Sequence, residues 1–222
     1  MSVDGDRPTT VVKVWDLPTR VFHGAIVALL AFLWWTEKTE DIPDHKLAGF
    51  ALIALIVFRI YWGVAGSETA RFSRFVRGPR EVWRYLIGRA PKVLGHSPIG
   101  ALSVLVMLFL LMVESMLGLF AVEEDGLESG PLAPAVGLDW AQLAAHWHAI
   151  LFNVLIGFVL LHVAAVLLYW VAGKNLVVPM ITGRKKVSGT PQPPRFGSAW
   201  SMLVGIALAS ACFAWLWRLD GH

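Results

Sequence analysis

The chain consists of long apolar runs separated by shorter polar connections. Five runs reach or approach the length that a helix needs to cross about 30 Å of hydrocarbon, and they cover residues 21–36, 47–64, 99–121, 143–172 and 196–216. No run shows the ten-residue alternation of apolar and polar positions that is typical of an outer-membrane barrel. The first run is short, so its helix is expected to begin near Pro18, where proline is tolerated. The pattern predicts an all-α integral membrane protein.

Composition supports this class. Hydrophobic residues make up 56% and charged residues 16% of the 222 positions, and eleven of them are tryptophan, which is far from the usage of a soluble domain. Cys212 is the single cysteine, so the chain forms no intramolecular disulfide and has no CxxC redox pair. The first ten residues are polar and lack a basic segment followed by a cleavable apolar stretch, so the first run is expected to be an anchor rather than a signal peptide.

The basic residues predict an orientation. Sixteen of the nineteen Lys and Arg residues lie in the amino-terminal segment, the second connection and the fourth connection. The positive-inside rule therefore places these segments in the cytoplasm and the carboxyl terminus outside. Topology and contact with lipid headgroups explain the basic segments better than nucleic-acid binding does. The other two connections, 37–44 and 123–139, are acidic.

Four histidines form two pairs at matching depths. His148 and His162 are 14 residues apart on the fourth run, which places them about 21 Å apart along a helix and within about 40° of one face. The first helix runs outward and the fourth inward, so His23 matches His162 near the cytoplasmic face. His45, expected just before the second helix, matches His148 near the outer face. Each histidine alone could be a satisfied polar residue, but the paired depths favour metal binding.

Haem iron suits these pairs better than bare zinc or copper. A structural zinc site takes four protein ligands and a catalytic one usually three, whereas axial ligation of a porphyrin takes two. No CxxCH motif occurs, so the haems are expected to be non-covalent and b-type. Two side-chain ligands on each iron favour electron transfer over chemistry at the metal. We expect His23 and His162 to bind an inner haem, and His45 and His148 an outer haem.

Five further residues are candidates for a role near these pairs. Arg59 lies 14 residues after His45 and either snorkels to the interface or pairs with a buried carboxylate or a cofactor acid. Gly49 leaves space beside His45 for a flat group. His96 is expected to be interfacial rather than a third inner ligand. Glu114 lies within the third span, where it is protonated, bonded to a neighbour or part of a proton relay. His146 lies about 160° from His162 around the helix and is expected to face away.

Several segments together resemble the bacterial di-haem cytochrome b561 family, in the longer form that opens with a VWDLPTRVFH-type sequence. They are residues 14–23, 45–50, 58–63, 95–100, 130–133, 148–153, 161–163 and 175–184. The resemblance implies a four-helix haem-binding bundle within residues 1–186, with ligands at His23, His45, His148 and His162. Gly24 stands where a tryptophan commonly follows the first ligand. Residues 187–222 are expected to form a linker and a fifth transmembrane helix, which is either an added anchor or a surface for a partner.

The resemblance also suggests what the protein does. The leading hypothesis is electron transfer across the bacterial cytoplasmic membrane, between the quinone pool and a periplasmic redox partner such as a c-type cytochrome. The first alternative is a superoxide oxidase that passes electrons from superoxide to quinone. The second is a haem-bearing anchor subunit of a dehydrogenase or hydrogenase complex. The acidic outer connections suit a basic partner, although they also serve simply to keep the loops solvated. Membrane lipid and quinone are the expected small partners, and a homo-oligomer remains open.

Overall fold

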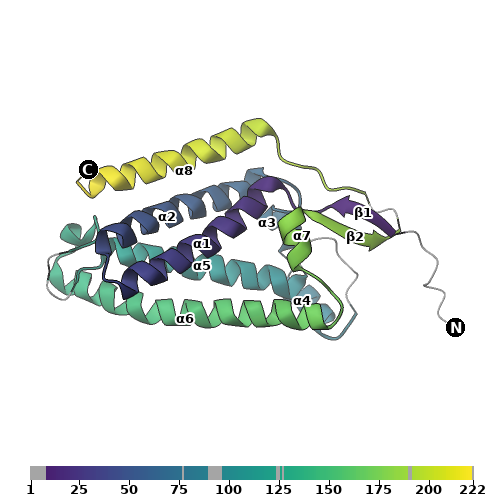
Figure 1. The fold of residues 1–222 in the computed structure, drawn as a ribbon, viewed down its shortest axis with the longest axis horizontal. Helices are drawn as coiled ribbons and strands as arrows, with labels where there is room; N and C mark the ends of the chain where they lie inside the picture. Colours follow the sequence, from purple (N-terminus) through teal and green to yellow (C-terminus); the bar gives the residue numbers. More distant parts are fainter. Residues whose placement is uncertain are drawn as a thin grey trace.

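The computed structural model describes residues 9–76, 78–89, 97–123, 126, 128–189 and 192–221. Within these ranges, five helices are long and apolar enough to cross a membrane. They are α1 (Leu17–Lys38), α2 (Ile42–Ala65), α5 (Pro98–Phe120), α6 (Leu138–Val171) and α8 (Ala199–Leu219). All five extend along the long axis of the molecule (Figure 1). The predicted all-α membrane architecture is confirmed.

Most helices begin earlier than their apolar runs suggest. Asp41 caps α2, which starts at Ile42, so the expectation that His45 precedes the second helix was wrong: His45 lies within its first turn. α6 starts at Leu138, after Gly137 with a φ of 79°. The physical reason is that the first turn of a helix tolerates polar residues, because its free N–H groups bind caps. An apolar pattern therefore misses such a turn.

Helix α2 is the centre of the bundle. It packs against α1, α5 and α8, while α6 packs against α5. One buried cluster draws from four helices, with Leu33 of α1, Leu52 and Ile56 of α2, Leu111 of α5 and Leu155 of α6. The many large apolar side chains that remain exposed suit contact with lipid. The four helices that carry the predicted ligands or their neighbours thus share one core.

Short elements gather at the end of the bundle where α1 begins and α6 ends, which we call the inner end (Figure 1). They are α3 (Phe72–Phe75), α4 (Pro79–Leu86), α7 (Val177–Thr182), β1 (Thr9–Lys13) and β2 (Arg184–Ser188). The two strands pair antiparallel, with Thr9 opposite Ser188 and Lys13 opposite Arg184. The sequence analysis did not predict this sheet, and strand β2 extends into the expected linker. The opposite, outer end carries η1 (Ala133–Ala135) and the carboxyl end of α8.

Three of the resembling segments meet at the inner end. Asp16 caps α1 by accepting from the Thr19 N–H at 2.8 Å, and its second oxygen accepts from Trp62 Nε1 at 2.9 Å. The carbonyl of Gly183 accepts from the Trp15 N–H at 3.1 Å. Gly183 has a φ of 76°, and a Cβ there would lie 2.7 Å from the Trp15 oxygen. Residues of these three segments therefore hold the start of α1, the end of α2 and the end of α7 together.

Helix α8 is packed against α2 over most of its length. Near the inner end, the hydroxyls of Ser201 and Tyr61 lie 3.2 Å apart. One turn further along α8, Gly205 is so close to α2 that a Cβ would lie 2.9 Å from Cδ1 of Tyr61. At the outer end, Lys46 Nζ pairs with Asp220 Oδ1 at 3.0 Å. The fifth helix is thus an integral part of the bundle, and the division of the chain at residue 186 stays a prediction.

Candidate functional site

The outer histidine pair brings together α2 and α6. The ring centroids of His45 and His148 are 6.3 Å apart, and their planes cross at 88°. An imidazole nitrogen binds a transition metal at about 2 Å, and the ring centre lies roughly 1 Å further, so two rings across one metal have centres about 6 Å apart. The observed separation therefore fits two axial ligands of a single iron.

The hydrogen bonds of these rings decide their tautomers. Nδ1 of His45 lies 3.1 Å from the Leu33 carbonyl oxygen, and Nδ1 of His148 lies 3.0 Å from the Glu114 carbonyl oxygen. A carbonyl oxygen only accepts, so each Nδ1 carries the proton and donates it. Each Nε2 then keeps a free lone pair for a metal. A histidine that binds a metal through one nitrogen usually donates the other N–H in this way.

Three further residues line the outer pair. The sequence analysis did not connect them with it. Thr36 is buried on α1, with its hydroxyl 3.2 Å from Nδ1 of His45. The Glu114 carboxyl oxygen Oε1 lies 3.2 Å from Nδ1 of His148. One turn along α5, a Cβ at Gly118 would lie 3.1 Å from Cε1 of His148. Glu114 was noticed in the sequence because a carboxyl group in an apolar run is unusual, but nothing there named its partner. Thr36 and Gly118 left no local signal.

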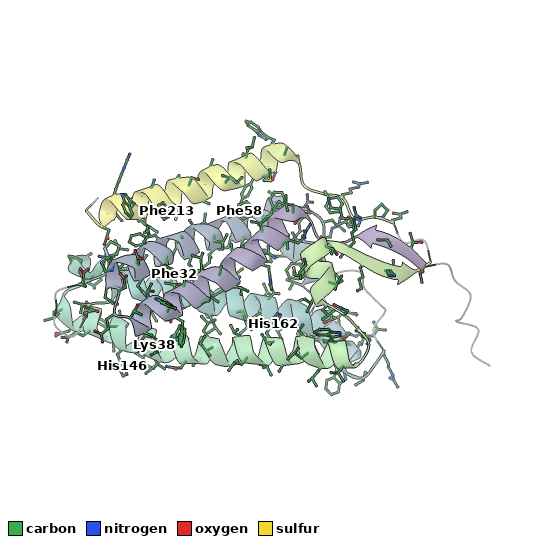
Figure 2. The ribbon with its side chains drawn as sticks, in the orientation of Figure 1. Phe32, Lys38, Phe58, His146, His162 and Phe213 are labelled. Atoms are coloured by element: carbon green, nitrogen blue, oxygen red, sulfur yellow. The ribbon has the colours of Figure 1, made fainter. Side chains whose placement is uncertain are left out.

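The predicted inner pair lies on α1 and α6, where His23 and His162 are both half-buried. Figure 2 shows His162 toward the inner end of α6 and His146 near the opposite end. His146 is exposed, with its ring against that of Trp147 at 6.0 Å between centroids. The binding of one haem by His23 and His162 stays a prediction.

Arg59 of α2 is buried against α1 and α3. Only 3% of the residue is exposed, and its Nη1 donates to the Ala70 carbonyl oxygen at 3.3 Å. Its guanidinium lies over the rings of Phe72, at 4.9 Å, and Phe22, at 5.8 Å. Phe22 directly precedes His23, so this cation lies against the turn of α1 that carries His23. Burial at this level does not agree with a side chain that snorkels to the aqueous surface.

A glycine borders open space near the outer pair. A Cβ at Gly49, one turn after His45, would meet no atom within 4 Å. Such bare backbone suits the approach of a flat ring.

His96 lies outside the described residues, as do Glu124 and Asp125 of the third connection.

The donor set fits haem better than a bare metal ion. Across the described ranges, no group of three or more His, Cys, Asp or Glu side chains is arranged to hold a metal ion. A zinc site would require such a group. Paired imidazoles with free Nε2 atoms supply instead the two axial ligands of a porphyrin iron.

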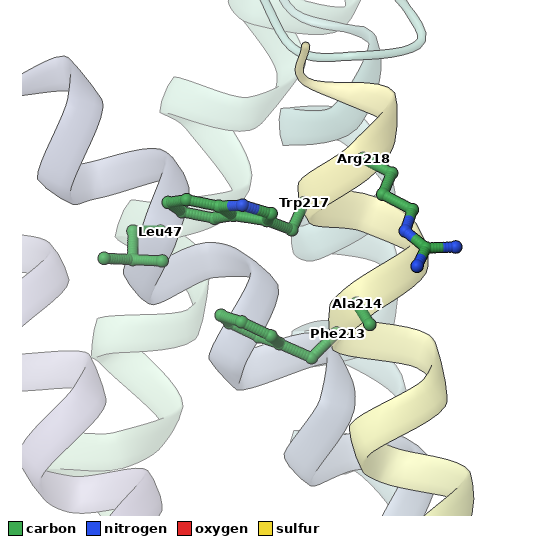
Figure 3. A pocket seen from close by; sticks show the side chains of 5 residues that line it. All are labelled: Leu47, Phe213, Ala214, Trp217 and Arg218. Carbon is green, nitrogen blue, oxygen red and sulfur yellow. The ribbon is translucent and has the colours of Figure 1, made fainter. Parts of the chain in front are cut away.

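A separate pocket lies between α2 and α8 at the outer end (Figure 3). Its volume is about 370 Å³, and it is lined by Leu47, Phe213, Ala214, Trp217 and Arg218. The Phe213 and Trp217 rings stack, with centroids 6.3 Å apart. None of the four paired histidines lines this pocket, so it is distinct from the candidate metal sites.

Comparison with known proteins agrees with this geometry. A family model described as prokaryotic cytochrome b561 matches residues 14–183, which include all four paired histidines. A curated relative from Azotobacter chroococcum mcd 1, named "Probable Ni/Fe-hydrogenase B-type cytochrome subunit", is 25% identical over 194 residues. The match covers 71% of this chain and 80% of the relative. No solved structure gives a significant match.

Proposed function

Because this chain belongs to the prokaryotic cytochrome b561 family and is a membrane b-type cytochrome, we propose that it binds two b-type haems and carries electrons across the membrane. The inner haem is held by His23 and His162, and the outer haem by His45 and His148. Electrons pass between the quinone pool and a redox protein at the outer end. The bacterial cytoplasmic membrane is the proposed location, with the inner end in the cytoplasm and the carboxyl terminus in the periplasm.

The geometry of His45 and His148 carries this proposal. Their ring centroids are 6.3 Å apart, and both Nδ1–H groups donate to backbone carbonyls. The protein therefore holds two Nε2 lone pairs ready without needing to move a proton. A haem bound there would supply a one-electron redox centre, and the two imidazole ligands would favour electron transfer over chemistry at its iron.

One rigid helix sets the distance between the two sites. His148 and His162 both lie on α6, about 21 Å apart along its axis, so this helix would hold the two haems at different depths of the membrane. Gly49 leaves open space beside the outer pair. Arg59 is the proposed partner of an acid group of the inner haem, since its buried guanidinium has further N–H donors besides the one on Ala70.

The name of the relative supports a second candidate. That protein is called a hydrogenase B-type cytochrome subunit, so this chain is also a candidate membrane subunit that receives electrons from a separate dehydrogenase or hydrogenase chain. The two candidates share the haems and differ in the outer partner. A subunit that stays bound during mild purification favours the second candidate.

The experiment that tests the proposed sites is haem quantification on the purified full chain and three variants. Wild type is expected to contain two low-spin b haems per chain. His148→Ala should lose the outer haem and keep the inner one, and His162→Ala should do the reverse, because each removes one axial ligand. His146→Ala is the matched control on the same helix, and it should keep both. Two haems in either His148→Ala or His162→Ala would refute the assignment.

A further inference from the structure

The two ligands of the proposed outer haem are held by different groups. Nδ1 of His45 lies near the Leu33 carbonyl and the Thr36 hydroxyl, at 3.1 and 3.2 Å. Nδ1 of His148 lies near two oxygens of one residue, the Glu114 carbonyl at 3.0 Å and its carboxyl Oε1 at 3.2 Å. Only the second ring has a carboxyl group against it.

Burial makes Glu114 a costly residue at this position. It is 5% exposed on an apolar helix, and a carboxyl group taken from water loses several kcal/mol unless it is bonded. Among the described residues, its Oε2 has no hydrogen-bond partner, so the contact of Oε1 with His148 is the one that helps offset this cost. A residue retained only for packing would not need the carboxyl group.

Gly118 completes the surface on which the His148 ring lies. It follows Glu114 by one helical turn, so both residues share a face of α5. A Cβ at Gly118 would lie 3.1 Å from Cε1 of the ring, which is tighter than ordinary van der Waals contact. The bare glycine lets the ring approach α5 until Nδ1 is within reach of both Glu114 oxygens.

We propose that Glu114 is a positioning residue for the outer haem: its carboxyl oxygen, together with its carbonyl, fixes the tilt and rotation of the His148 ring. One acceptor fixes the direction of an N–H bond, and a second acceptor to the side restricts how the ring turns about it. The planes of His45 and His148 then stay crossed at the observed 88°. This proposal rests on the proposed function, because it requires an outer haem between His45 and His148.

The test compares Glu114→Leu, which removes the side-chain acceptor, with Glu114→Gln, which keeps an acceptor of the same length. Met116→Leu on α5, at an exposed position, is the control. All are made in the His162→Ala background, so that the outer haem alone is observed. Transfer of haem to an excess of apomyoglobin measures its release. Glu114→Leu is expected to release haem roughly 10- to 100-fold faster, while Glu114→Gln and Met116→Leu should stay within a few-fold of the background.

Paramagnetic resonance of the ferric haem gives a second measurement. The anisotropy of a low-spin signal depends on the angle between the axial imidazole planes, so it should change in Glu114→Leu and be restored in Glu114→Gln. Gly118→Ala, which adds a methyl group against the ring without removing a polar atom, should also change it. Alanine suits a helix, so this variant tests the idea even if Glu114→Leu fails to fold.

The outcomes separate the two proposals. An unchanged release rate and signal in Glu114→Leu, or an unchanged signal in Gly118→Ala, would overturn the positioning role and leave the haem assignment intact. Equal losses in Glu114→Leu and Glu114→Gln would also overturn it, since the acceptor would then be irrelevant. Retention of both haems in His148→Ala would instead refute the proposed function itself.

Discussion

At the scale of single residues, the proton positions on two imidazoles make the outer site competent to bind a metal. Leu33 and Glu114 offer backbone carbonyls to His45 and His148, and each carbonyl selects the tautomer with a free Nε2. These acceptors come from α1 and α5, which carry neither ligand of the pair. Helices α1 and α5 therefore orient the rings of His45 and His148, although neither helix carries a proposed ligand of the outer haem.

Asp16 is the residue whose loss should most disturb the inner end. Both of its oxygens are used, one on the Thr19 N–H and one on Trp62 Nε1, and it is 4% exposed. Asp16→Ala removes a helix cap and leaves the buried indole N–H without its acceptor, so it should cost about 2 to 4 kcal/mol of stability. Asp16→Asn, which keeps the cap, should cost less. Unfolding in detergent, followed by tryptophan fluorescence, measures both, and equal stability of Asp16→Ala and wild type would contradict this role.

At the scale of elements, α8 is held on α2 near both of its ends. Ser201 contacts Tyr61 near one end, Asp220 pairs with Lys46 at the other, and Gly205 allows close approach between them. Lys46 directly follows His45, so α8 supports the helix turn that carries this proposed ligand of the outer haem. An anchor that only tethers the chain would not need such contacts.

Gly205→Leu should separate α8 from α2, because a side chain there meets Tyr61 and Phe58 within about 3 Å of its first atom. The single cysteine reports this change: Cys212 is half-buried on the same helix and packs on the cluster of Phe50 and Ile53. Its labelling by a small, membrane-permeant thiol reagent is expected to be faster in Gly205→Leu. Leu208→Phe, which adds bulk at an exposed position of α8, is the control and should label as wild type does. Equal labelling in both variants would show that Gly205 is not part of a tight contact.

At the scale of the whole molecule, the two ends differ in charge. Basic residues from β1, β2, α3 and α4 gather at the inner end, while Glu37, Asp44 and Glu128 lie in the segments at the outer end. With the two proposed haems and the proposed orientation, such a protein would connect a cytoplasmic side rich in Lys and Arg to an outer side whose acidic segments would attract basic partners.

Vesicles containing the purified protein test this directional role. Supplied with quinol, they should reduce an external, basic c-type cytochrome faster than protein-free vesicles do, and His148→Ala should abolish the difference because it lacks the outer haem. Rising ionic strength should slow the transfer, since screening weakens attraction between the acidic segments and a basic partner. Transfer that is indifferent to salt would refute the acidic docking surface alone. No transfer at any salt concentration would refute transmembrane transfer to this partner.

The amino-acid sequence by itself determined the helical membrane class, and it predicted that His45 and His148, whose rings the structure places 6.3 Å apart, share one depth. The reason is that both depend on local quantities: a span needs a fixed length of apolar residues, and the period of a helix sets which residues share a face. The resembling segments added the family, which the match over residues 14–183 confirmed.

Only the tertiary structure decided which groups from distant parts of the chain meet. It brought Glu114 and Gly118 against His148 and packed α8 on α2. It also paired β1 with β2, although the sequence of α1 to α7 lies between these two strands. These contacts join residues that are tens to more than a hundred positions apart, and no local period records them. Helix periodicity predicts where a side chain points, whereas the packing of neighbouring helices decides what it touches.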